Sequence, residues 1–295
     1  MSKYLVLAIF AIFAAACSND YETDKHVNNQ AVPVRVHVTG FSVDQEDFPS
    51  TKGTSTVAAY SGVNAITLAF YKGDGTEVEK ITQLKADGTT YTTFGDFECS
   101  LPMGTYTMVV VAYTTKDESP FVLTSPTAAA FTGLHAYETF VNTQEVVISN
   151  TAAVDISATL DRVIAQLKVV STDGKTADVT NVRMTFSAGG KSFNPSTGLA
   201  TVNTGFVNTV GNSASVGAPS TSSTMLFLAT DEQNINVTIE TLDADGNTLF
   251  SKTIENVSFK RNRVTKLTGK MYTNDALSGS FQVNTDWLTD ANVGF

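Results

Sequence analysis

The residue types that most often carry catalysis or metal binding are present in this sequence, but their spacing fits no known site. The three histidines, His26, His37 and His135, are scattered and lack the spacing of metal ligands. We expect His37 to be exposed on the polar face of a strand. Neither a nucleophile elbow nor a zinc-protease helix motif occurs. The sequence therefore predicts no catalytic residue, no metal site and no cofactor.

Two short stretches imitate ligand-binding loops. Residues 189–192, Gly-Gly-Lys-Ser, resemble the end of a phosphate-binding loop, but Thr185 occupies the position of the first required glycine. Residues 243–247 resemble the start of a calcium loop, but Ile254 stands where the bidentate glutamate is needed. We expect the first stretch to lie among strands without a nucleotide. The second is typical of a hairpin turn.

Cys17 is the residue to which the sequence does assign chemistry. Lys3 gives a positive start, Tyr4–Ala16 is an apolar run, and Ala14–Ala16 provides small residues directly before Cys17. This pattern predicts a signal peptide over residues 1–16, cleavage after Ala16 and acylation of Cys17, as in bacterial lipoproteins. The apolar run is too short to span a bilayer, whereas two acyl chains anchor stably. The alternative is a plain secretory signal followed by a chance cysteine.

Residues 17–30 have a composition typical of a flexible tether. They contain almost no apolar side chains and include Asp20, Glu22 and Asp24, so they cannot bury enough surface to offset ordering. The acidic residues resemble the tract that sends some lipoproteins to the outer face of the outer membrane. An ordinary polar linker is the alternative.

Charge and cysteine content limit the possible partners. The formal net charge of −10 makes nucleic acid an unsuitable partner. Cys99 is the second of two cysteines, so acylation of Cys17 leaves no intramolecular disulfide. We expect Cys99 to behave as a small core hydrophobe, and the fold to depend on packed apolar surface.

Apolar periodicity predicts an all-β protein. Val32, Val34, Val36 and Val38 alternate with polar residues, which is typical of a strand with one buried face. Further strands follow at roughly ten-residue spacing with Gly-rich turns, a pattern typical of sandwiches. We expect one β-sandwich over residues 31–150 and a second over 151–295. Other expectations are one long strand over 160–170, a short helix within 127–140 and an exposed loop over 203–224.

Four segments together resemble the fimbrillin family, the subunits of type V pili of Bacteroidales. They are Ile66–Gly75 and Leu101–Ala112 in the first half, and Leu160–Val169 and Lys260–Gly269 in the second. The resemblance spans most of the chain and implies two tandem transthyretin-like β-sandwich domains, exported as a lipoprotein.

The resemblance also implies assembly by strand exchange. In stalk subunits of that family, a protease specific for Arg or Lys removes the first strand, and the groove then accepts a strand from the next subunit. Here the removable strand would be Val32–Val38. Alternatively, the strand Val32–Val38 stays in place, and Trp287 packs in its own domain. The candidate cleavage positions are Lys25, Arg35 and Lys52, and the candidate donor-strand residues are Phe281, Val283 and Trp287.

The leading hypothesis is a non-enzymatic, structural or adhesive surface lipoprotein, either a fimbrial subunit or an anchor. Its expected partners are other fimbrial subunits, the outer membrane through the N-terminal lipid, and a host or bacterial surface ligand. The expected location is the outer membrane or cell surface, within a fimbrium. Stalk, tip and anchor roles stay open. The alternative from another class is a surface glycan-binding lipoprotein, and a hydrolase is the least favoured hypothesis.

Overall fold

Every regular element in the described part of the chain is a β-strand, which confirms the predicted all-β class. The computed structural model describes residues 30–42, 57, 60–86, 93–273 and 281–284. Within these residues, no helix is long and apolar enough to cross a membrane. The strands are β1 (Val32–Ser42), β2 (Ala65–Tyr71), β3 (Glu77–Leu84), β4 (Asp96–Leu101), β5 (Gly104–Tyr113), β6 (Phe121–Ser125), β7 (Ala128–Phe131), β8 (Thr139–Ile148), β9 (Val154–Arg162), β10 (Ala165–Ser171), β11 (Asn181–Phe186), β12 (Ser192–Asn194), β13 (Leu199–Ala200), β14 (Phe206–Gly211), β15 (Thr221–Leu226), β16 (Glu232–Leu242), β17 (Thr248–Lys260), β18 (Val264–Gly269) and β19 (Gln282–Asn284).

The first half of the chain forms one sheet that packs against itself. Its strand order is β3-β2-β5-β8-β9-β1-β4. β8 and β9 pair through only two residue pairs, Phe140 with Arg162 and Val141 with Asp161. Apolar side chains of β1, β4 and β9 meet those of β2, β5 and β8 in one core. The buried Gln83 on β3 bonds the backbone beside β4, which holds the two ends of the sheet together.

The second half is a sandwich of two four-stranded sheets. One has the order β15-β10-β18-β19 and the other β14-β11-β16-β17. Their facing side chains form a separate core that includes Leu167, Val182, Ile239 and Phe259. β19 adds to the edge of β18 through three residue pairs. The predicted β-sandwich class is therefore confirmed.

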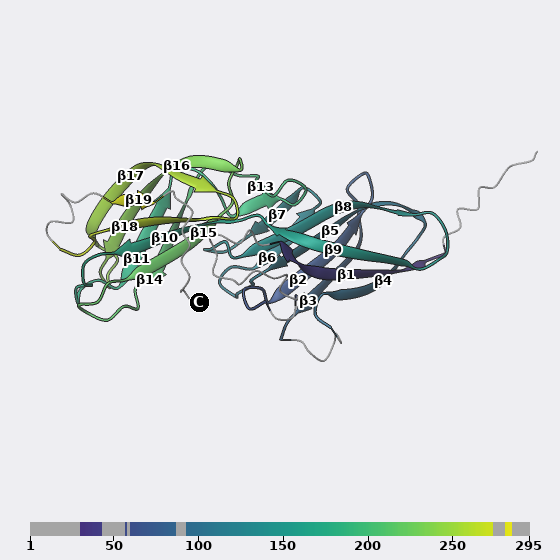
Figure 1. Cartoon of the computed structure of the whole chain (residues 1–295), viewed down its shortest axis with the longest axis horizontal. Coiled ribbons are helices and arrows are strands. Elements are labelled where there is room, and N and C mark those ends of the chain that lie inside the picture. Colours follow the sequence, from purple (N-terminus) through teal and green to yellow (C-terminus); the bar gives the residue numbers. More distant parts are fainter. Residues whose placement is uncertain (1–29, 43–56, 58–59, 87–92, 274–280, 285–295) are drawn as a thin grey trace, which may run out of the picture.

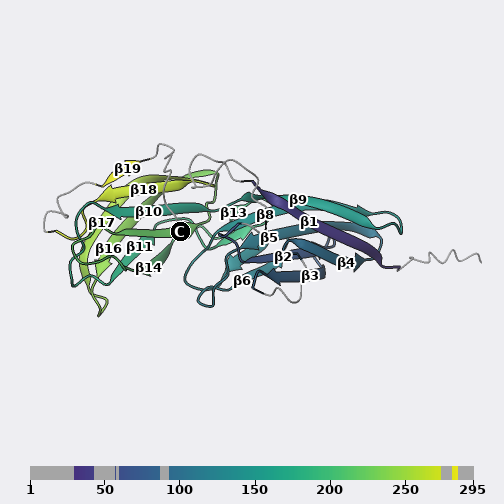
Figure 2. The ribbon, with the colours of Figure 1, turned by 60° about the horizontal axis from the view of Figure 1, so that its bottom comes forward.

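A fourth sheet joins the halves, which lie along the long axis of the molecule (Figures 1 and 2). Its order is β13-β12-β7-β6, so strands of both halves pair directly. Beneath it, Phe193 and Phe227 from the second half stack with ring centroids 4.4 Å apart. Phe131 of the first half stacks on Phe227 at 6.4 Å. The halves are thus joined by backbone pairing and by a shared aromatic core.

The expected helix within residues 127–140 is wrong. Residues 128–131 form β7, and β8 begins at Thr139. The run Ala128–Ala130 has high helix propensity, but propensity is a weak prior that tertiary contacts override. Here Ala129 pairs with Phe193 and is buried in the shared core.

Two strand expectations also need correction. The expected single strand over 160–170 is two strands, because the buried residues Val163 and Ile164 lie between β9 and β10. β9, expected to open the second sandwich, instead pairs with β1 in the sheet of the first half. The expected loop over 203–224 contains β14 and the start of β15. Alternation predicts a strand but does not identify its partner.

Candidate functional site

The first strand, β1, occupies the groove in which the sequence places strand exchange. β1 pairs antiparallel with β4 on one side and parallel with β9 on the other. The side chains of Val32, Val34, Val36 and Val38 are almost fully buried in the core. Burying a valine contributes about 1.5–3 kcal/mol relative to leaving it exposed. β1 therefore fills a row of apolar sites that the neighbouring strands cannot fill themselves.

The opposite face of β1 carries charged side chains that are paired across the sheet. Arg35 Nε lies 3.1 Å from Glu98 Oε1 on β4, and its guanidinium lies 4.0 Å from Asp155 Oδ1 on β9. His37 Nδ1 lies 2.9 Å from Asp96 Oδ1. The side chains of Arg35 and His37 are about half exposed, and exposure was expected for His37. Pairs this exposed contribute little stability each, about 0–1 kcal/mol.

The structure places Arg35 where a protease would not reach it without local unfolding, because both neighbouring strands pair with its backbone.

Of the predicted donor residues, Phe281 lies against Gly269, the last residue of β18. Val283 lies in β19 and pairs with Leu267 of β18. These two predicted donor residues are thus close together and far along the chain from Arg35. Ala16, Cys17, Lys25, Lys52 and Trp287 lie outside the described residues.

Cys99 lies directly opposite Val34 in the register of β4 and β1. It packs partly buried against the first core, in line with its expected hydrophobic role. Burial raises the pKa of its thiol to about 11, and the Glu79 carboxylate adds to the rise. Because the thiolate is the reactive form, Cys99 is a weak nucleophile at neutral pH.

A buried ionic cluster lies at the junction of the halves, and sequence reasoning missed it. Arg162 Nη2 lies 2.6 Å from Glu138 Oε1 and donates to Tyr60 Oη at 2.7 Å. Tyr60 also donates to Glu138, and Arg162 Nη1 donates to Asn262 Oδ1 at 3.2 Å. The Arg162 side chain is 1% exposed and packs over the Phe140 ring. Burial raises the pKa of Tyr60 well above its usual value, with Glu138 contributing.

The alternation of β9 was a signal for this cluster. Ala158, Leu160 and Arg162 share one side of the strand, and the first two are buried. An arginine on the buried face of a strand requires a buried counter-charge. The sequence alone does not identify Glu138 as that partner, since it lies in the loop just before β8, away from β9 in the sequence.

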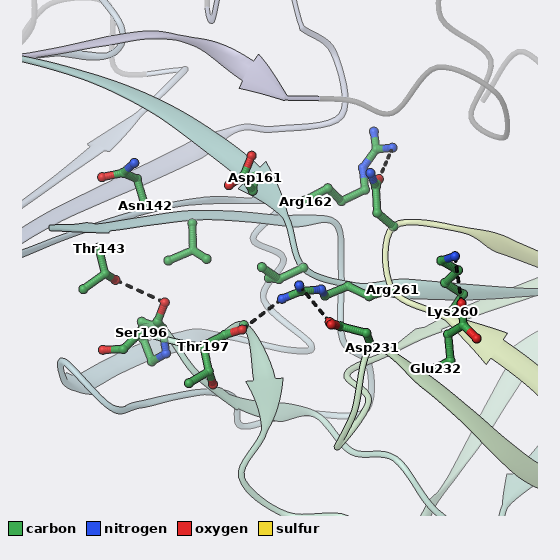
Figure 3. Close-up of a pocket in the computed structure, with 15 residues that line it drawn as sticks. Asn142, Thr143, Asp161, Arg162, Ser196, Thr197, Asp231, Glu232, Lys260 and Arg261 are labelled. Carbon is green, nitrogen blue, oxygen red and sulfur yellow. Dashed lines mark hydrogen bonds and ion pairs between the residues drawn. The ribbon is translucent and has the colours of Figure 1, made fainter.

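A polar cleft of about 750 Å³ opens beside this cluster, at the contact between the halves (Figure 3). Its walls come from the ends of β8 and β9, the turn after β12, and the turns before β16 and after β17. Arg261 donates to the Thr197 carbonyl at 2.9 Å and pairs with Asp231 at 2.8 Å. Lys260 pairs with Glu232 at 2.7 Å. Its lining contains no aromatic side chain, so the cleft suits a polar ligand but offers no stacking platform for a sugar.

The two imitation loops have structural roles. The Asp243 carboxylate accepts N–H bonds from Asp245 and Asn247, which confirms the predicted hairpin turn. Gly189 N donates to Asn203 Oδ1 and Gly190 N to the Phe227 carbonyl, so the backbone donors that a phosphate needs are already used. Among the described residues, no group of three His, Cys, Asp or Glu side chains could hold a metal ion.

The fold is similar to those of several solved bacterial proteins. Two candidate adhesins from Bacteroides ovatus match with TM-scores of 0.50 and 0.51, at 14% and 11% identity. The matches cover 82% and 88% of this chain and 88% and 94% of the others. The fimbrial anchor protein Mfa2 from Porphyromonas gingivalis matches with a TM-score of 0.51 at 12% identity, covering 86% of this chain and 95% of Mfa2.

At these identities the likeness establishes a shared fold, and at that level it confirms the predicted resemblance to fimbrial proteins. No curated protein matches the chain significantly. The sequence profile of a family of unknown function, DUF6562, matches residues 28–293, almost the whole chain. The chain belongs to this DUF6562 family.

Proposed function

We propose that this chain is a structural or adhesive subunit, or the anchor, of a surface fimbria, and that it is not an enzyme. Its halves would be two tandem transthyretin-like domains with the boundary after β9. Acylation of Cys17 would hold residues 17–30 at the outer membrane. The shared fold with the fimbrial anchor Mfa2 and with candidate adhesins supports a role at the cell surface.

The observation that carries the proposal is the position of β1. β1 lies between β4 and β9 and places four valines in the core. A cut after β1 would leave it held only by non-covalent contacts: backbone hydrogen bonds, buried valines and the charged pairs of its outer face. The vacated groove would then present two open strand edges and a row of apolar sites, which suits strand addition.

The test uses the mature full-length chain with a specific protease sequence inserted after Lys52. After cleavage of the folded protein, we expect β1 to remain bound in native mass spectrometry and to be displaced by excess peptide of residues 30–42. A matched peptide carrying Val34→Asp and Val36→Asp should bind at least about a hundredfold more weakly, because it places carboxylates in the core. The uncut chain should bind neither peptide.

Failure of the native peptide to enter the cut chain would contradict strand exchange. If the cut chain also bound oligosaccharides, the alternative of a glycan-binding lipoprotein would be favoured. The polar cleft between the halves would then be the site to test, with Arg261→Ala as the variant.

A further inference from the structure

The groove around β1 has a charged rim as well as an apolar floor. The outward side chains of the flanking strands are acidic or uncharged: Asp96, Glu98 and Ser100 on β4, and Asp155, Ser157, Thr159 and Asp161 on β9. None of them is basic. The basic groups at this face come from β1 itself, as Arg35 and His37.

The geometry makes Arg35 the centre of this arrangement. It is in register with Glu98 on one side and with Asp155 on the other. Its guanidinium lies within 4.0 Å of both carboxylates. His37 is in register with Asp96 and lies 2.9 Å from it. Removing β1 would leave three neighbouring carboxylates on the two open edges, Asp96, Glu98 and Asp155, without their partners on β1.

The C-terminal segment of this chain does not carry the complementary charge. If Phe281, Val283 and Trp287 faced the core, the intervening outward positions would include Asp286 and, further on, Asp290. No Lys, Arg or His follows Lys270 in the sequence. Like charges placed directly opposite each other on neighbouring strands are destabilising. The C-terminal segment of a second copy, used as the donor, would therefore place carboxylates beside carboxylates.

We propose that the β1 groove selects, from a neighbouring subunit, a donor strand with apolar residues at alternate positions and basic residues between them, and that it discriminates against the C-terminal segment of a second copy of this chain. The inference rests on the proposed strand exchange and adds the chemistry of the partner. Apolar pockets would supply most of the affinity, while the acidic rim would discriminate among donors. Such a groove would favour a strand with the charges of β1 over one that places carboxylates opposite the rim.

The cut full-length chain described above tests this with four labelled peptides. Two are residues 30–42 and the same peptide with Arg35→Glu and His37→Glu. The other two are residues 279–291 and that peptide with Asp286→Lys and Asp290→Lys. At about 0.01 M salt, where charges act over tens of ångströms, we expect the native first-strand peptide to bind about tenfold more tightly than its acidic variant. The lysine variant of the C-terminal peptide should likewise bind more tightly than the unmodified C-terminal peptide. Both differences should shrink at about 1 M salt.

Equal binding of each pair at low salt would overturn the charge selection while leaving strand exchange intact. If no peptide bound the cut chain, including the native peptide of residues 30–42, the strand exchange on which the inference rests would be overturned.

A second measurement needs no exchange. In the intact chain, Arg35→Glu should lower the melting temperature. That loss should largely disappear in a background of Asp96→Asn, Glu98→Gln and Asp155→Asn. An equal loss in both backgrounds would contradict the role of the acidic rim.

Discussion

Glu138→Gln is expected to lower the free energy of unfolding by about 3–5 kcal/mol, although it changes one oxygen to nitrogen. The substitution keeps the shape of the side chain but removes the carboxylate that lies 2.6 Å from the buried Arg162 guanidinium. A buried cation without its counter-charge carries a desolvation cost that hydrogen bonds to Tyr60 and Asn262 only partly offset. Chemical denaturation monitored by tyrosine fluorescence or circular dichroism measures the change.

Glu232→Ala is the matched control, because it breaks an ion pair at the rim of the same cleft. Glu232 is 64% exposed, so its loss should cost no more than about 1 kcal/mol. A cost for Glu138→Gln similar to that of Glu232→Ala would show that the cluster does not hold the junction together.

Phe227→Ala is expected to destabilise the protein by about 3–5 kcal/mol and to loosen the contact between the halves. Phe227 is fully buried and stacks on Phe193 and on Phe131 of the first half. Its backbone bonds Gly190 just before β12, so the cavity would open under the joining sheet. Denaturation gives the loss in stability, and small-angle scattering reports the mean separation of the halves.

Val207→Ala serves as the comparison, since Val207 is a large apolar residue of the second half that is 53% exposed. Its removal should change the stability by less than about 0.5 kcal/mol. A Phe227→Ala protein with unchanged stability and unchanged scattering would mean that the joining sheet alone fixes the two halves.

The sequence predicts local structure well where one face of a strand is buried. The valines of β1 alternate from Val32 to Val38, and each is buried in the structure. The turn at Asp243–Asn247 was likewise predictable, because Asp and Asn side chains bond to the backbone of their own turn. These features depend on neighbours within a few residues.

Long-range pairing could not be predicted in the same way. β1 and β9 lie side by side in parallel although more than a hundred residues separate them, and no local pattern specifies that contact. The ionic cluster brings Tyr60, Glu138, Arg162 and Asn262 together from four parts of the chain. The alanines of β7 form a strand through pairing with the neighbouring β6 and with the distant β12, and not through their own propensity.

The central claim is that β1 can leave its groove and that another strand can enter in the same register. The most direct measurement is a disulfide trap at Cys99, which faces Val34 in that register. Opposed residues of antiparallel strands have Cα atoms about 4.5–5.5 Å apart, within the range of a disulfide. The chain carries Cys17→Ser and the cut after Lys52, and the probe is a peptide of residues 30–42 with an activated Cys in place of Val34.

Mildly alkaline buffer is needed, because the raised pKa of Cys99 leaves little thiolate at neutral pH. We expect the Val34→Cys peptide to become linked to Cys99 in the cut chain but not in the uncut chain. A peptide with Arg35→Cys, whose thiol points to the outer face, should not become linked in either. Linking of both peptides alike, or of neither to the cut chain, would contradict an exchangeable first strand.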